Sequence, residues 1–87
     1  MSRCSDLLEK ARRNPEGLRF ADLCKLAECH GWVFARQKGA HRLYTMPGAP
    51  RPMNFQEGEK GASKTYQVRQ LLNWIEDNRE GTSDVDS

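Results

Sequence analysis

Three segments of the chain repeat apolar residues at the spacing of an α-helix. The clearest segment is 20–30, where apolar side chains at i, i+3, i+4 and i+7 make one continuous face, and Gly31 supplies a left-handed end. The other predicted helices span residues 1–14, with Ser5 as the N-cap, and residues 65–77. The apolar positions of the three helices are Leu7, Leu8 and Ala11, then Phe20, Leu23, Cys24, Leu26 and Ala27, and finally Val68, Leu71, Leu72 and Ile75.

Between the second and third helices the pattern changes to short runs typical of β-strands. Residues 32–37 are rich in aromatic and β-branched types, Gly39 permits a tight turn, and residues 41–46 return as a second strand. Residues 51–56 form at most a short edge strand, because prolines at its start cannot donate ladder hydrogen bonds. The aromatic side chains expected in the core are Trp32, Phe34, Phe55 and Trp74.

The predicted order of elements is helix, helix, three-stranded meander, helix. Three short antiparallel strands cannot bury both of their faces, so the helices are expected to pack on one face and leave the other open. This pattern predicts a small α+β domain in residues 1–77, in which residues 1–17 are an N-terminal helical extension. Residues 78–87 have few apolar side chains and are expected to form a disordered acidic tail.

Cysteine content favours a reducing compartment. Cys4, Cys24 and Cys29 are odd in number and form no C-x-x-C pair, so Cys24 and Cys29 are interpreted as small apolar groups on or beside a helix face. A metal site built from Cys24, Cys29 and His30 would have none of the standard zinc spacings. The chain also lacks a secretory signal and an apolar run of about 18 residues, which predicts a cytoplasmic protein with no membrane span.

The net charge of +2 conceals an uneven distribution. Residues 77–87 hold four acidic side chains and one basic side chain, a local charge of −3 that leaves +5 on the rest of the chain. No acidic residue lies between Glu28 and Glu57. The basic residues within that interval are Arg36, Lys38, Arg42 and Arg51. A solvated face can be basic without function, but a basic hairpin is also the electrostatic pattern of a phosphate-binding surface.

His41 follows the turn of this basic hairpin and is the first candidate for chemistry. RNA cleavage without a metal needs one group to take a proton from the 2′-hydroxyl and another to protonate the leaving 5′-oxygen. Histidine suits either transfer, since its ordinary pKa of about 6.5 lies near neutral pH. A lone histidine at a strand start is more often structural, so spacing alone favours the structural interpretation. His41 shares strand parity with Leu43, which leaves open the face on which it lies.

Several groups near His41 are candidates for RNA contacts. The basic candidates are Arg36, Lys38 and Arg42, together with Lys64 and Arg69 near the start of the last helix, where a solvated helix start is an equal explanation. Gly39 would let the RNA backbone come close to the turn. Tyr44 shares parity with Arg42 and is a candidate to stack on a base, whereas the alternative is a packing partner across the sheet.

The hairpin and its flanks resemble the signature of HicA-type toxins over the run Cys29-His-Gly-Trp-Val-Phe-Ala-Arg-Gln-Lys-Gly-Ala-His-Arg-Leu-Tyr44. In that family a helix leads into a glycine, a hydrophobic strand, a K-G-[S/T]-H motif and a strand that ends in tyrosine. The resemblance continues through Pro52-Met-Asn-Phe55 and Tyr66-Gln-Val-Arg-Gln-Leu-Leu72, so it covers residues 18–77.

This resemblance implies a ribosome-independent mRNA interferase of a type II toxin–antitoxin system, with a fold similar to the double-stranded RNA-binding domain. It also implies a HicB-type antitoxin as partner, and neither a metal nor a cofactor. Carried over by position, the family's catalytic histidine falls on His41 and its turn glycine on Gly39. The preceding basic residues of the family fall on Arg36 and Lys38. Ala40 stands where many members have serine or threonine, and the histidine that many members carry after the third strand is missing.

Three classes of function follow from the sequence. The leading hypothesis is an RNA-cleaving toxin in which His41 is the general acid or base, with mRNA and an antitoxin as partners. The second is a non-catalytic RNA-binding module that uses the same basic face, with salt-sensitive binding and no cleavage. The third is a protein-interaction domain whose open sheet pairs with another chain and has negligible affinity for RNA.

Overall fold

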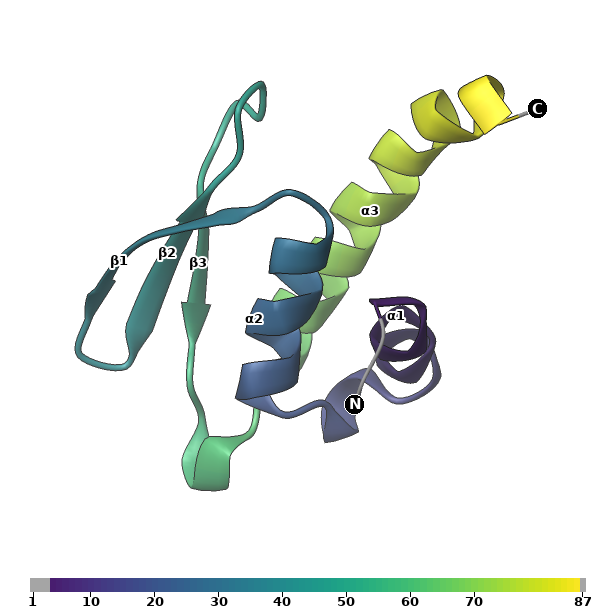
Figure 1. The fold of residues 1–87 in the computed structure, drawn as a ribbon. Coiled ribbons are helices and arrows are strands. Elements are labelled where there is room, and N and C mark those ends of the chain that lie inside the picture. The colour runs from purple at the N-terminus through teal and green to yellow at the C-terminus, as the bar shows by residue number, and fades with distance from the viewer. Residues whose placement is uncertain (1–3, 87) are drawn as a thin grey trace.

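The computed structural model describes the backbone of residues 4–86 and the side chains of residues 4–78. Within these residues the chain forms two helices, an antiparallel sheet and a third helix (Figure 1). Their bounds are α1 Cys4–Arg13, α2 Phe20–Cys29, β1 Val33–Lys38, β2 His41–Thr45, β3 Met53–Gln56 and α3 Thr65–Asp86, with 3-10 turns at Pro15–Gly17 and Glu59–Gly61. The predicted α+β class, the order of elements and the three-stranded meander are confirmed.

α1 is part of the core and not only an extension of it. Leu7 and Ala11 lie in the shared hydrophobic core, with 2% and 0% of their surface exposed. Ser5 lies inside the helix, so its predicted role as N-cap is wrong. A 3-10 turn at Pro15–Gly17 then redirects the chain, in agreement with the proline and glycine of that segment.

α3 is longer than the sequence predicts. It continues to Asp86, so the predicted end at Asp77 is wrong, and the backbone of residues 78–86 is helical where the sequence predicts disorder. A helix that is already formed adds residues at low cost, because each added residue gains one backbone hydrogen bond. Ser87 lies outside the described residues. None of the described helices, α3 included, combines the length and apolar character needed to cross a membrane.

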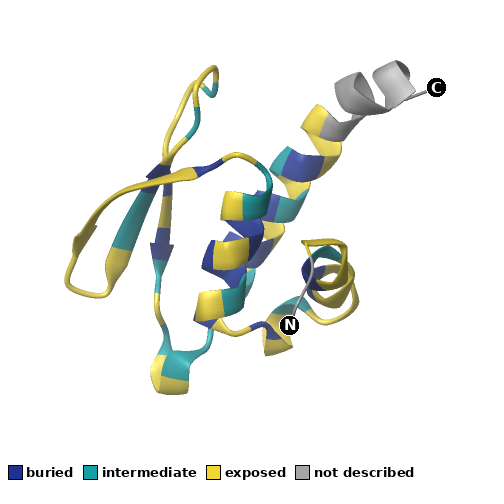
Figure 2. Ribbon diagram, viewed as in Figure 1, coloured by how far each residue is buried: buried dark blue, intermediate teal, exposed yellow. Residues whose placement is uncertain are grey.

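The core lies between one face of the sheet and the helices, where Figure 2 shows the buried residues gathered. The sheet contributes three side chains to this core, Tyr44 from β2 and Met53 and Phe55 from β3. Each is at most 5% exposed. The Tyr44 and Phe55 rings pack with their centroids 5.6 Å apart. Trp32 meets Trp74 edge-on at 5.2 Å, an arrangement that aromatic pairs prefer. Within residues 4–86 no helix lies over the opposite face of the sheet, as the sequence predicts.

β1 is an edge strand that contains a bulge. All of its residues are exposed, so the expected core position of Phe34, which is 44% exposed, is wrong. Phe34 pairs with Tyr44 across the sheet. Arg36 then pairs with Leu43, which leaves Ala35 as an extra residue in β1. Because directly paired residues lie on the same face, the bulge places Arg36 on the face opposite to Phe34.

A side chain of α3 covers the other edge of the sheet. Gln67 is 4% exposed, and its amide lies against β3 as a neighbouring strand would. Its Oε1 accepts a hydrogen bond from the Gln56 N–H at 2.8 Å, and its Nε2 donates to the Asn54 carbonyl at 3.0 Å. One amide side chain therefore satisfies two backbone groups of an edge strand.

We expect Gln67→Met to lower the free energy of unfolding by about 2 kcal/mol, because it keeps the side-chain length but leaves those two backbone groups without partners. Urea unfolding measures the change. Gln70→Met, on the exposed side of the same helix, is the matched control and should stay within about 0.5 kcal/mol of the parent. Equal stability of the two variants would show that Gln67 does not stabilise the sheet edge.

A disulfide joins Cys4, at the start of α1, to Cys29, at the end of α2. The interpretation of Cys29 as a small apolar group is therefore wrong, whereas Cys24 is unpaired and buried as expected. Cys29 in this bond is no thiolate ligand for a metal. The bond spans 25 residues of sequence and fastens α1 to the helix that leads into β1.

Loss of this disulfide is expected to lower the free energy of unfolding by about 3 kcal/mol, since a closed loop of this length restricts the unfolded chain. Urea unfolding of the oxidised and reduced protein measures the difference. Cys4 is exposed, so Cys4→Ser removes the bond with little loss of packing. The free energy of unfolding of this variant should equal that of the reduced parent, and a reductant should not change it. Identical stability of the oxidised and reduced parent would contradict the prediction.

Candidate active site

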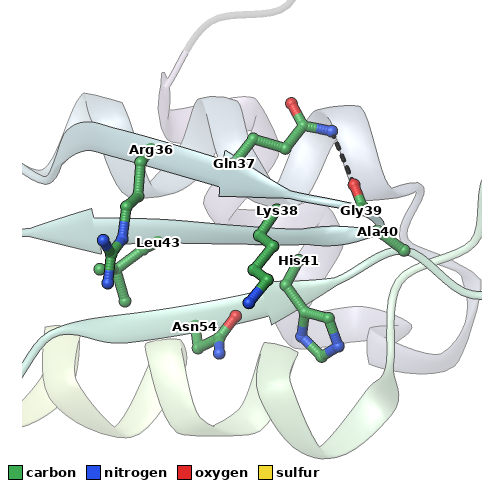
Figure 3. A pocket seen from close by; sticks show the side chains of 8 residues that line it. All are labelled: Arg36, Gln37, Lys38, Gly39, Ala40, His41, Leu43 and Asn54. Atoms are coloured by element: carbon green, nitrogen blue, oxygen red, sulfur yellow. Dashed lines mark hydrogen bonds between the residues drawn. The ribbon is translucent and has the colours of Figure 1, made fainter.

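The β1–β2 hairpin borders an open cavity of ≈ 710 Å³ on the sheet face that points away from α2 (Figure 3). Most of the lining comes from the hairpin itself, and β3 adds one residue. The lining residues are Arg36, Gln37, Lys38, Gly39, Ala40, His41, Leu43 and Asn54. The predicted site residues that the structure brings together here are His41, Arg36, Lys38 and Gly39.

Strand pairing explains why these side chains meet. Lys38 lies directly opposite His41, and Leu43 lies directly opposite Asn54. Directly opposed side chains have Cβ atoms about 5 Å apart. The bulge in β1 adds Arg36 to the same face. Two cations from β1 and an imidazole from β2 therefore border the same open space, where one phosphate group could contact them.

The turn Gly39-Ala40 connects Lys38 to His41. Gly39 has a φ of 60°, in the left-handed region that favours glycine. A Cβ at this position would meet nothing within 4 Å, so the backbone conformation and not crowding requires the glycine. The Ala40 carbonyl accepts a hydrogen bond from the Glu57 N–H at 3.0 Å, which ties the turn to the end of β3.

The two histidines of the chain have different environments. His41 is exposed at the cavity and can reach a bound substrate. His30 is half-buried at the C-cap of α2, away from the cavity lining. Burial and, secondarily, the charge of Arg12 lower the pKa of His30 below its ordinary value, which favours the neutral form. His41 is therefore the histidine that the structure presents for proton transfer.

Arg42 and Tyr44 lie on the other face of the sheet from His41 and do not line the cavity. Tyr44 is fully buried, so its predicted role in base stacking is wrong and the alternative, a packing partner within the sheet, is correct. Its hydroxyl donates to Glu28 Oε2 at 3.1 Å, and burial raises its pKa above the ordinary value. Arg42 donates to this hydroxyl at 3.5 Å, behind the sheet.

Lys64 and Arg69 are not part of the cavity lining. Lys64 is half-buried immediately before α3, and Arg69 is exposed on the first turns of that helix. The structure therefore does not bring these two cations together with His41. Whether they contact RNA elsewhere on the surface stays a prediction.

Asn54, Gln37 and Leu43 line the cavity although the sequence does not single them out. Asn54 alternates along β3 with the buried Met53 and Phe55, and this alternation is a usable signal for the open face. Leu43 carries no comparable signal, because a leucine is expected in a core. Gln37 is part of the lining, but it pairs directly with Arg42, so its side chain lies on the face behind His41.

The cavity combines groups that suit chemistry on a phosphodiester. An exposed imidazole can transfer a proton near neutral pH, while a guanidinium and an ammonium can stabilise negative charge on a phosphate. The Asn54 side chain adds an amide that can donate or accept a hydrogen bond. Among the described side chains, no group of three or more histidine, cysteine, aspartate or glutamate residues is arranged to hold a metal ion.

Comparisons with protein-family models, with curated proteins and with solved structures find no match to this chain.

Proposed function

We propose that this chain is an endoribonuclease whose active site is the cavity of the β1–β2 hairpin. The observation that carries the proposal is that His41 shares one open cavity with Arg36 and Lys38. The acid-free interval between Glu28 and Glu57 supports it, because a substrate backbone would meet no opposing carboxylate from this part of the sequence.

More narrowly, we propose a toxin of the HicA type, an mRNA interferase of a type II toxin–antitoxin system. The resemblance of residues 29–44 to the family signature supports this assignment, and so does the order of helices and strands. The proposed partners are mRNA as substrate and a HicB-type antitoxin as inhibitor. The proposed reaction uses no metal and no cofactor.

In the proposed reaction the 2′-oxygen attacks the adjacent phosphorus and the bond to the 5′-oxygen breaks. The products are a 2′,3′-cyclic phosphate and a 5′-hydroxyl end. His41 acts as general base toward the 2′-hydroxyl or as general acid toward the 5′-oxygen, and a second group makes the other transfer. Arg36 and Lys38 stabilise the charge that builds up on the phosphorane.

The proposal places the protein in the cytoplasm, where its mRNA substrate is found. Cytoplasmic thiols act against disulfides, so the Cys4–Cys29 bond would be exposed to reduction there. The stability of the reduced chain then decides how much folded toxin is present, and the urea experiment on the reduced protein measures that stability.

Incubation of the purified chain with single-stranded RNA and a chelator tests the proposal. We expect fragments that end in a 2′,3′-cyclic phosphate, and RNA binding that weakens as salt is added. Binding without cleavage at any pH would identify a non-catalytic RNA-binding module instead. Neither binding nor cleavage would leave the protein-interaction domain as the remaining class.

A further inference from the structure

Side-chain hydrogen bonds connect α2, β2 and β1 on the sheet face behind His41. The Tyr44 hydroxyl donates to Glu28 Oε2 on α2 at 3.1 Å. Arg42 donates through Nη1 to the Tyr44 oxygen at 3.5 Å, and through Nε to Gln37 Oε1 at 3.3 Å. We refer to the side chains of Glu28, Tyr44, Arg42 and Gln37 as the bracing network.

The bracing network ends on the turn that carries His41. Gln37 donates from Nε2 to the Gly39 carbonyl at 3.1 Å, the dashed line in Figure 3. A Cβ at Gly39 would meet nothing within 4 Å, so no side chain packs against that side of the residue. The neighbouring Ala40 carbonyl is held separately by the Glu57 N–H. Gln37 therefore restrains the half of the turn that the contact with Glu57 does not reach.

Arg42 is the centre of the network and is itself restrained. Its guanidinium carbon lies 5.2 Å from the centroid of the Phe34 ring, within the range of a cation–π contact. A side-chain hydrogen bond with Cys24 raises the pKa of Arg42 above its ordinary value. Burial raises the pKa of Tyr44, so the hydroxyl keeps the proton that it donates to Glu28. Arg42 therefore donates at both of its contacts, and the Tyr44 hydroxyl donates to Glu28 and accepts from Arg42.

We propose that the bracing network positions His41 in the RNA-cleaving site, so that Gln37 and Arg42 are positioning residues. The inference rests on the proposed function of the hairpin cavity. Gln37 restrains Gly39 before the histidine, and Arg42 follows the histidine in β2 with its side chain on the opposite face. A displacement of about 1 Å in a reacting group can cost roughly a hundredfold in rate, so restraint of this turn has a kinetic effect.

The first experiment measures the order of the turn without reference to RNA. Gln37→Met keeps the side-chain length, changes no charge and alters an exposed position, so the fold is expected to survive. We expect the NMR order parameters of the Gly39 and Ala40 amides to fall from about 0.85 toward about 0.6. Gln70→Met on α3 is the control and should leave both values unchanged. Unchanged order parameters in Gln37→Met would overturn the bracing role, whatever the RNA assay shows.

The second experiment separates positioning from phosphate binding. For Gln37→Met we expect kcat to fall roughly tenfold, while KM and the salt dependence of RNA binding stay unchanged. Arg42→Lys keeps the positive charge but loses the fork of donors, so it should show the same fall in kcat. If Arg42 instead contacted phosphate, Arg42→Lys would keep its kcat, and Arg42→Gln would reduce the salt slope by about 0.7.

The two experiments also separate this inference from the proposed function. A parent protein that cleaves no RNA refutes the proposed function and the positioning role together, while the order parameters still decide whether the network holds the turn. A loosened turn with unchanged kcat refutes the positioning role alone. A loosened turn with reduced kcat and an unchanged salt slope supports both the proposed function and the positioning role.

Discussion

Replacement of His41 by alanine is expected to abolish RNA cleavage while the fold and RNA binding remain. General acid–base catalysis by a positioned histidine typically contributes 10²- to 10⁴-fold to a rate, so a loss of at least about a hundredfold is expected. His41 is exposed and packs in no core, and its removal therefore costs little stability. The parent and His41→Ala are compared in three measurements. Cleavage of labelled RNA gives the rate, circular dichroism reports the fold, and a titration gives the affinity for RNA.

His30→Gln is the matched control for this experiment. His30 is half-buried and lies outside the cavity lining, so its replacement should leave the cleavage rate within a few-fold of the parent. The same comparison in cells asks whether expression of the parent arrests growth and whether His41→Ala is harmless. A folded His41→Ala protein that cleaves as fast as the parent would show that the proposed mechanism is wrong.

The double substitution Arg36→Gln and Lys38→Gln is expected to weaken RNA binding roughly tenfold or more at low salt. Each phosphate contact to a single strand contributes about 0.7 to the slope of log K against log salt, so the slope should fall by about 1.4. Both side chains line the cavity from the edge strand, and neither contributes to the hydrophobic core. Binding titrations of labelled RNA over a series of salt concentrations measure the affinity and the slope together.

Lys10→Gln with Arg13→Gln is the matched control, because it removes the same charge from α1. Those two cations form exposed ion pairs with Asp22 and Glu9, so their loss should change stability by no more than about 1 kcal/mol. If both double variants reduce affinity and slope equally, net charge and not the hairpin cavity accounts for RNA binding.

The helices and the sheet could be predicted because their signals are local. The apolar repeat of residues 20–27 has one period and one burial face, and Phe20, Leu23, Cys24 and Ala27 are all buried in the structure. Gly31 ends the same helix with a φ of 96°, in agreement with a left-handed cap. The positions of turns also follow local residue chemistry, as at Gly39.

The face of each hairpin residue could not be predicted from local signals. Alternation places His41 and Leu43 on one face of β2, and Arg42 and Tyr44 on the other. Each face therefore has one titratable or basic residue and one large hydrophobic or aromatic residue, so the pattern does not say which face is buried. Tyr44 is buried because its ring packs within the core while its hydroxyl reaches Glu28 on a different element. The bulge at Ala35 then reverses the parity of β1, and no residue type in that strand signals it.

The sequence by itself determined the α+β class, the order of the elements and the basic, acid-free hairpin that contains His41. These properties depend on composition and on spacing along a few residues. Only the tertiary structure decided that Arg36 and Lys38 share a cavity with His41, that Arg42 and Tyr44 lie behind it, and that Cys4 bonds to Cys29. Each of these outcomes depends on strand register or on contacts between distant segments, and register and long-range contacts are set by packing of the whole chain.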